Sequence, residues 1–356
     1  WIGGLSPSAM ALNLNIFSAL CGTACIGLLY LLMTRLVYQN LDHDHGERAG
    51  NHVVAAVMAA AVSAVALTFC VPFWMASTRL HFQVFDLLLL LLMAHLCLAF
   101  TKQFNMWLGL LFALLYGVCI VESVSFTAFA PIFIIYIFYV AYRQEKLQFW
   151  RFFLLGLFAV AGLAFFLLVA DNFCRLGDLS LRGYEGFWDV VYTMLRDHVK
   201  TLRASVPLPP ELGFMFYLIT WLLWLAGLLI ARRSLNETRE WGFYIFHIIM
   251  TIAALVILGY AWSVLRDQSR LQVTLYTMMA MVTGYLAAYW FLLVANFRTL
   301  MPSGGVNPAN SPRVRAGVWM GYAFSACLFV LIVGTSIING FEASGKRGAF
   351  VDACAG

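Results

Sequence analysis

The chain has 356 residues, of which 63% are hydrophobic and only 11% are charged. Soluble domains carry roughly 25% charged residues because their surface faces water, so this composition excludes a soluble globular protein. The formal net charge is +5, but the Lys and Arg residues are scattered through short polar segments. A nucleic-acid-binding protein would gather them on one face, so that class is excluded too.

The apolar runs of the chain are about twenty residues long, the length that an α-helix needs to cross roughly 30 Å of hydrocarbon. They predict an all-α polytopic bundle of about ten transmembrane helices, with residues 1–356 forming a single transmembrane domain. The predicted spans are 11–38, 52–73, 82–100, 104–121, 125–142, 150–170, 212–231, 241–262, 270–296 and 315–338. Short connections at 101–103 and 122–124 predict two helical hairpins, and the last four spans with a tail form residues 212–356.

The segment 171–211 is long and polar, and its pattern predicts one amphipathic helix. Its apolar residues recur at the i, i+3, i+4 spacing of one helical face, and they are Phe187, Val190, Val191, Met194, Leu195, Val199 and Leu202. The segment is too charged to cross a bilayer, so we expect a helix over 185–203 that lies flat in the headgroup layer. A helix that merely packs on the membrane domain is the alternative.

Charged side chains inside hydrocarbon are costly, which makes them functional candidates. Arg79, Gln83 and Asp86 share one face of a helix at the start of span 82–100, with His81 beside them. They could form the polar wall of a cavity that opens to the outside of the membrane. Alternatively they form an interfacial cap, in which Arg79 extends toward the headgroups and pairs with Asp86.

Other polar candidates lie at turns on the same predicted side of the membrane. Glu122, at a hairpin tip, could bind a metal ion or accept a proton, although a solvated carboxylate is the simpler interpretation. Arg266, next to Asp267, could bind a phosphate, and here too a solvated turn is simpler. His247 lies inside an apolar run, where a histidine is more often a hydrogen-bonded packing residue than a ligand.

The phrase LNLNIFSALCGTACIGLLYLLMTRLV, residues 12–37, is the most specific part of the sequence. Its informative residues are Asn15, Phe17, Ser18, Ala19, Leu20, Gly22, Leu29 and Tyr30. The phrase resembles the second transmembrane helix of the multipass protein O-mannosyltransferase-like family, which belongs to the GT-C membrane glycosyltransferases. Pro72-Phe73-Trp74 resembles the aromatic pair of the family's third helix, and Gly177-Asp178 resembles its outer loop.

The resemblance covers about residues 5–200, and the sequence departs from the family pattern inside that range. His81-Phe82-Gln83 stands where the family has Glu-Val-Tyr, and Glu122-Ser123 stands where it has Asn-His. GT-C enzymes carry their essential acidic residue in the first outer loop, which the resemblance places before Trp1. The catalytic residue of this chain is therefore unknown.

The resemblance implies transfer of a sugar from a polyprenyl-phosphate carrier to an acceptor outside the cytoplasm, a protein or a glycan. Such chemistry uses a carboxylate to activate the acceptor hydroxyl and positive groups to stabilise the leaving phosphate. The substrate-binding residues that we expect are Arg79, His81, Gln83, Glu122, Asp178, Arg182 and Arg266. The sequence identifies no metal ligands, and a divalent metal ion stays an option that the family's chemistry leaves open.

Two further functions stay open. A transporter or flippase would also handle a lipid-linked or anionic substrate, although the two halves of the chain show no convincing repeat. A non-catalytic membrane scaffold would explain the departures at His81 and Glu122. For each reading the chain is an integral membrane protein in contact with membrane lipid, and we expect the bacterial inner membrane.

The loops of the predicted bundle differ in their Lys and Arg content, which predicts its orientation. Twelve such residues lie in the loops on one side and three in the short loops on the other, so the first side is cytoplasmic. The segment 171–211 and the tail after 338 then lie outside, where Cys174 and Cys354 could form a disulfide. A disulfide requires a Cα separation below about 7 Å.

We therefore expect the loop from His43 to Arg48 to be cytoplasmic and the tail after Asn339 to be extracytoplasmic. A cysteine introduced at Gly345 should react with a membrane-impermeant maleimide on intact cells. A cysteine introduced at Gly46 is the matched control and should react only after the cells are opened. Labelling of Gly46 but not Gly345 in intact cells would invert the topology.

Overall fold

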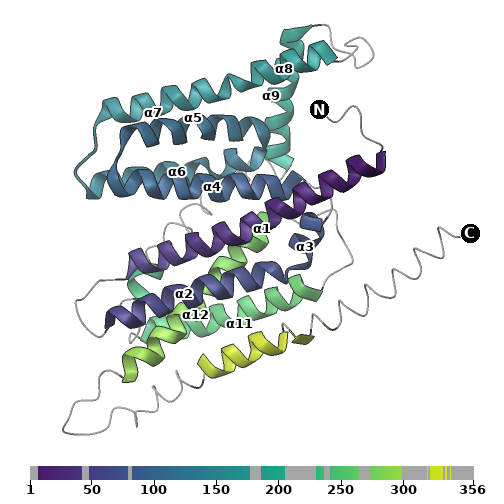
Figure 1. Cartoon of the computed structure of the whole chain (residues 1–356). Helices are drawn as coiled ribbons and strands as arrows, with labels where there is room; N and C mark the ends of the chain where they lie inside the picture. The colour runs from purple at the N-terminus through teal and green to yellow at the C-terminus, as the bar shows by residue number, and fades with distance from the viewer. Residues whose placement is uncertain are drawn as a thin grey trace, which may run out of the picture. The chain divides into compact units, whose positions relative to one another are not determined.

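The computed structural model describes residues 7–41, 48–78, 82–176, 186–204, 230–235, 241–263, 273–298, 319, 321–331, 333–334 and 337. Every regular element within these ranges is an α-helix (Figure 1). Five of the described helices are long and apolar enough to cross a membrane, and four shorter apolar helices accompany them. The predicted all-α membrane bundle is thereby confirmed, while the predicted span 212–231 falls almost entirely outside the described residues.

The main helices follow one another along most of the chain. They are α1 (Pro7–Asn40), α2 (Arg48–Thr68), α3 (Val71–Thr78), α4 (Phe82–Gln103), α5 (Met106–Glu122), α6 (Val124–Arg143), α7 (Phe149–Leu163), α8 (Phe165–Leu176), α9 (Phe187–Ala204), α11 (Trp241–Ser263) and α12 (Val273–Arg298).

Two predicted spans are each divided into two helices. The span 52–73 ends as α2 at Thr68 and resumes as α3 at Val71. Pro72 explains the break, because its ring would clash with the carbonyl of Thr68 in a continuous helix but is tolerated in a first turn. The span 150–170 divides at Ala164 into α7 and α8, and α8 extends beyond the prediction to Leu176.

The two predicted hairpins are confirmed, and local backbone chemistry explains their tight turns. After α4, Phe104 adopts a left-handed conformation with φ 47°. Asn105 then caps α5 by accepting a hydrogen bond from the backbone N–H of Trp107 at 3.1 Å. Between α5 and α6 a single residue, Ser123, makes the connection in an extended conformation.

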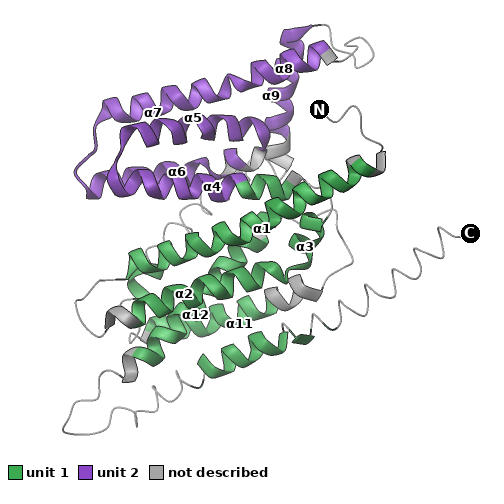
Figure 2. Ribbon diagram, in the orientation of Figure 1, with its two compact units in different colours: residues 1–88, 230–356 green, residues 89–229 purple. Residues whose placement is uncertain are grey.

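The chain forms two compact units (Figure 2). Unit 1 comprises Trp1–Leu88 and Ile230–Gly356, and unit 2 comprises Leu89–Leu229. Within unit 1, α2 packs against α1 and α12; within unit 2, α5 packs most extensively against α7.

Small residues let α2 and α12 approach closely in unit 1. Ala59 and Ser63 of α2 and Ala288 of α12 are completely buried. A Cβ atom added to Gly284 of α12 would clash with the Ser63 hydroxyl and with the carbonyl oxygen of Ala59. Helices in lipid are held together largely by such close packing of small residues, since burial from lipid provides no hydrophobic driving force.

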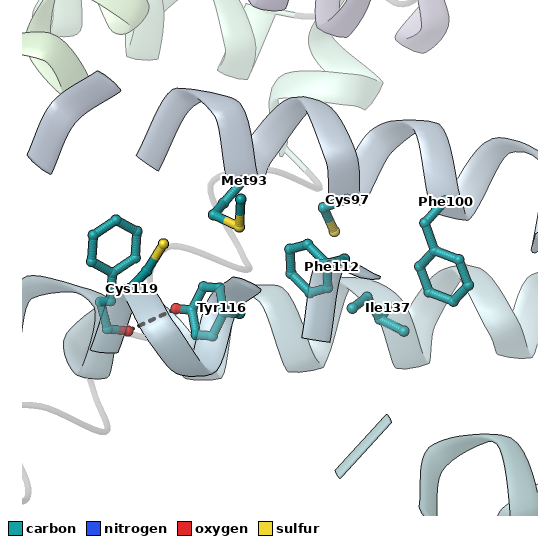
Figure 3. Packing of buried hydrophobic residues seen from close by; sticks show 8 residues of the cluster. Met93, Cys97, Phe100, Phe112, Tyr116, Cys119 and Ile137 are labelled. Carbon is teal, nitrogen blue, oxygen red and sulfur yellow. Dashed lines mark hydrogen bonds between the residues drawn. The ribbon is translucent and has the colours of Figure 1, made fainter. Parts of the chain in front are cut away.

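Aromatic and sulfur-containing side chains form the core of unit 2 between α4, α5 and α6. Figure 3 shows Met93 and Cys97 of α4 lying above Phe112 and Tyr116 of α5. The buried Tyr116 hydroxyl donates a hydrogen bond to the carbonyl oxygen of Phe126 at 2.7 Å, so its polar end is satisfied.

Helices α5 and α7 are in backbone contact at a pair of glycines. A Cβ atom on Gly117 would lie 2.8 Å from the Cα of Gly162 and would clash with the carbonyl oxygen of Ala159. A Cβ atom on Gly162 would in turn lie 2.9 Å from the Cα of Gly117. Neither neighbour is a flexible side chain, so the helices must separate if either glycine gains a side chain.

Replacing Gly117 with alanine should therefore destabilise unit 2 by about 1–3 kcal/mol through overpacking. Thermal unfolding of the detergent-solubilised protein measures the effect as a lower Tm. Gly156→Ala on α7 is the matched control, because a Cβ atom there meets nothing within 4 Å. Both variants gain the helix propensity of alanine, so equal Tm values for the two would contradict the close crossing.

Candidate functional site

The candidate site begins where α1 and α3 hold the N-terminal end of α4 in unit 1. The buried Ser18 hydroxyl donates a hydrogen bond to the carbonyl oxygen of Ala76 at 2.9 Å, which ties α1 to α3. One turn further along α1, a Cβ atom on Gly22 would lie 2.6 Å from the Cβ of Ser77. Glycine at that position is what allows α3 to lie against α1.

Helix α1 also contacts the first turns of α4. The ring centroids of Phe17 and Phe85 are 6.0 Å apart. The Cys25 thiol lies 3.5 Å from the carbonyl oxygen of Val84 and donates to it. These contacts fix the rotation of α4 about its axis at the turns that carry the polar residues Gln83 and Asp86.

Asp86 is a carboxylate that the structure buries in this region. Its side chain is only 8% exposed, and Gln83, three residues earlier on α4, is half-buried. A carboxylate on the lipid-facing side would not be covered by protein in this way, so Asp86 faces the protein interior. A buried carboxylate beside an amide can accept a proton from a hydroxyl or bind sugar hydroxyls.

The other predicted site residues are distributed as follows. Glu122 is exposed and is the last residue of α5, in unit 2, whereas Gln83 belongs to unit 1. The remaining five lie outside the described residues and stay predictions: Arg79, His81, Asp178, Arg182 and Arg266. The proposed pairing of Arg79 with Asp86 is untested for the same reason.

His247 of α11 is a packing residue, as its apolar surroundings predict. Its ring is fully buried and stacks on Tyr289 with centroids 3.6 Å apart. Its Nδ1–H donates to the carbonyl oxygen of Phe243, so Nε2 accepts from the Tyr285 hydroxyl, which also contacts the Ser234 hydroxyl. These hydrogen bonds connect the segment at 230–235 with α11 and α12.

The predicted amphipathic helix is confirmed as α9, and part of its apolar face packs against α8. Val190 and Val191 form a buried cluster with Ala170, and Phe187 and Met194 pack against it. Cys174 lies against the same cluster, while Cys354 is outside the described residues, so their disulfide stays a prediction.

His198 lies on the packed side of α9. Its Nε2 is 3.4 Å from the Thr127 hydroxyl of α6, and its ring meets Phe166 edge to face. Burial lowers the pKa of the His198 imidazole below its ordinary value of 6.5. The neutral ring is therefore the form that the packed helix favours.

The described residues contain no group of three or more His, Cys, Asp or Glu side chains that could hold a metal ion. Asp86 and Glu122 are therefore considered as individual carboxylates, one buried and one exposed.

A protein-family model matches the N-terminal part of the chain. Residues 3–148 match the family model described as the protein O-mannosyl-transferase TMEM260 N-terminal domain. The predicted resemblance to the O-mannosyltransferase-like family is confirmed. The matched residues include α1 to α6, and thus Ser18, Gly22, Gln83 and Asp86. Comparisons with curated proteins and with solved structures gave no match.

The sequence had indicated part of this site. The i, i+3 spacing of Gln83 and Asp86 placed them on one helical face. The spacing did not decide whether that face points toward protein or toward the headgroups. The hydrogen bonds of Tyr285 with His247 and with Ser234 had no local signal, because 38 and 51 residues separate the two pairs.

Acidification should loosen α9 from α6 and α8. The pKa of His198 is lowered in the packed state. The contribution of the neutral ring to the stability of the packed helix is therefore complete above pH 6.5, and it is lost as the pH falls from 6.5 toward the lowered pKa. Hydrogen–deuterium exchange, corrected for the intrinsic rate, should show less protection of α9 at about pH 5.5 than at about pH 7.5.

His198→Gln is the matched control, since glutamine keeps a polar group near Thr127 but does not titrate. The variant should show the same protection at both pH values. Equal protection of the wild-type helix at the two pH values would contradict the role of His198.

Proposed function

We propose that the protein is a membrane glycosyltransferase that transfers a mannosyl group from a polyprenyl-phosphate donor to a hydroxyl of an extracytoplasmic protein acceptor. The observation that carries the proposal is the match of residues 3–148 to a protein O-mannosyl-transferase family. The helical membrane architecture supports it, because a polyprenyl donor resides in the bilayer and must be reached from there. The bacterial inner membrane is the location that we propose.

The proposed reaction makes definite demands on the protein. The acceptor oxygen forms a bond to the anomeric carbon of the sugar, and the bond from that carbon to the phosphate oxygen breaks. The hydroxyl proton passes to a base, and the polyprenyl phosphate leaves with an additional negative charge. A carboxylate and nearby cations are therefore the groups to seek.

We assign the N-terminal end of α4 to the donor site. Buried Asp86 binds the reacting groups as a carboxylate, and Gln83 donates hydrogen bonds to sugar hydroxyls or to the phosphate. Arg79 and His81 precede them in the sequence and would supply positive charge to the leaving phosphate. Glu122, Asp178, Arg182 and Arg266 stay predicted contributors to substrate binding.

The assignment is tested with the protein in proteoliposomes, a radiolabelled polyprenyl-phosphate mannose and a peptide that contains serine and threonine. Wild-type protein should transfer label to the peptide, and Asp86→Asn should lower the rate about a hundredfold or more, as expected for loss of a catalytic carboxylate. Asp197→Asn removes an exposed carboxylate from α9 and should retain the wild-type rate. Each variant is checked for an unchanged Tm.

Two results would change the conclusion. Full activity of Asp86→Asn would remove Asp86 from the site but leave the transferase assignment in place. If the wild-type protein instead moves the mannosyl lipid across the bilayer without labelling any peptide, the transporter alternative replaces the transferase.

A further inference from the structure

Helix α9 presents a second apolar stripe that is separate from its packed face. The residues of the stripe are spaced i, i+4, i+7 and i+11, and they are Trp188 at 72% exposure, Tyr192 at 63%, Leu195 at 45% and Val199 at 51%. At about 100° per residue they fall within about 60° of the helix circumference. The sequence pattern had assigned Leu195 and Val199 to one face with Phe187 and Met194, whereas the structure separates the two sets.

Protein covers the first face and leaves the second uncovered. Val190 and Val191 are buried against Ala170 of α8, and Thr127 of α6 lies by His198 on the same side. Because these contacts fix the rotation of α9 about its axis, the stripe from Trp188 to Val199 must point away from α6 and α8.

Positive charge borders the stripe on one edge. The Arg196 guanidinium lies over the Tyr192 ring, 5.8 Å from its centroid, and its Nε is 3.8 Å from a carboxylate oxygen of the exposed Asp197. An arginine beside an exposed aromatic stripe is complementary to the phosphates of a lipid headgroup layer.

The neighbouring helices favour lipid over a protein partner. The span from Phe149 to Arg175, which forms α7 and α8, is apolar, and only 11% of its most apolar window is buried, as expected of a surface that faces lipid. Tryptophan and tyrosine are the side chains enriched at the level of the headgroups. A row of four side chains is also small beside the roughly 800 Å² per partner that a stable protein interface buries.

We propose that the stripe Trp188–Tyr192–Leu195–Val199 inserts into the headgroup layer of the membrane that holds the chain, with Arg196 bound to a lipid phosphate. Helix α9 then connects unit 2 to the membrane surface through one face while its other face packs on α6 and α8. The inference is independent of the enzymatic proposal, because it uses only the exposure, spacing and charge of α9.

The test uses nitroxide spin labels on the whole protein in phosphatidylcholine vesicles that contain phosphatidylglycerol. After Cys174, Cys327 and Cys354 are replaced by alanine, single cysteines are introduced as Leu195→Cys and Val199→Cys. Labels at both positions should collide several-fold more with oxygen, which concentrates in lipid, than with a water-soluble nickel chelate. Asp197→Cys, on the charged side of the helix, is the matched control and should show the reverse preference.

Two outcomes overturn the proposal. A preference for the nickel chelate at 195 and 199 would place the stripe in water. Low collision rates with both reagents would mean that protein, such as a second copy of the chain, covers it. For the lipid phosphate, Arg196→Gln should shift the label at 195 toward the nickel chelate in vesicles with phosphatidylglycerol and much less without it. An identical signal in both lipids would remove the role of Arg196.

Discussion

Close approach of helix backbones is the constraint on which the rest of the structure depends. Water is absent from the hydrocarbon layer, so each backbone N–H and C=O group must be satisfied within a helix, and the helices are then held by packing. Gly117 against Gly162 provides this contact between α5 and α7, and Gly284 against Ala59 provides it between α12 and α2. In both units a glycine brings two backbones together that any side chain would hold apart.

The same packing principle explains residues 12–37, the phrase that carries the family resemblance. Within that phrase, Ser18 hydrogen-bonds to Ala76, Gly22 makes room for Ser77, and Phe17 meets Phe85. These residues carry no chemistry of their own. Their role is to fix α3 and the start of α4, and through them the position of residues that can react. The most recognisable part of the sequence therefore positions the helix that carries the proposed site.

Two buried polar groups of unit 1, His247 and Asp86, differ in the cost of their burial. The hydrogen bonds of His247 with Phe243 and Tyr285 satisfy both ring nitrogens, and such a satisfied network connects helices and specifies their packing. Asp86 is different, because its carboxylate is ionisable and only 8% exposed, and burying a charged group is costly in this environment. This cost of burial is the reason why the start of α4 is the proposed site, whereas His247 of α11 is a packing residue.

The sequence by itself determined the membrane class, the helical hairpins and the amphipathic character of α9. It could do so because the length of an apolar run, the turn residues and the helical period are local properties. The break before Pro72 was equally readable from local chemistry, although the span 52–73 was predicted as continuous. The sequence also showed the departures from the family pattern at His81 and Glu122, but it did not show how these departures affect substrate binding.

Only the tertiary structure decided which way each polar or apolar face points. Helical spacing placed Gln83 and Asp86 together, but the contacts of α1 with α4 turned Asp86 toward the protein interior. Likewise the apolar residues of α9 divide into two faces, because Val190 is buried against α8 whereas Trp188 is exposed. The direction in which a helical face points depends on contacts with residues distant in the sequence. The periodicity of one helix contains no information about those contacts.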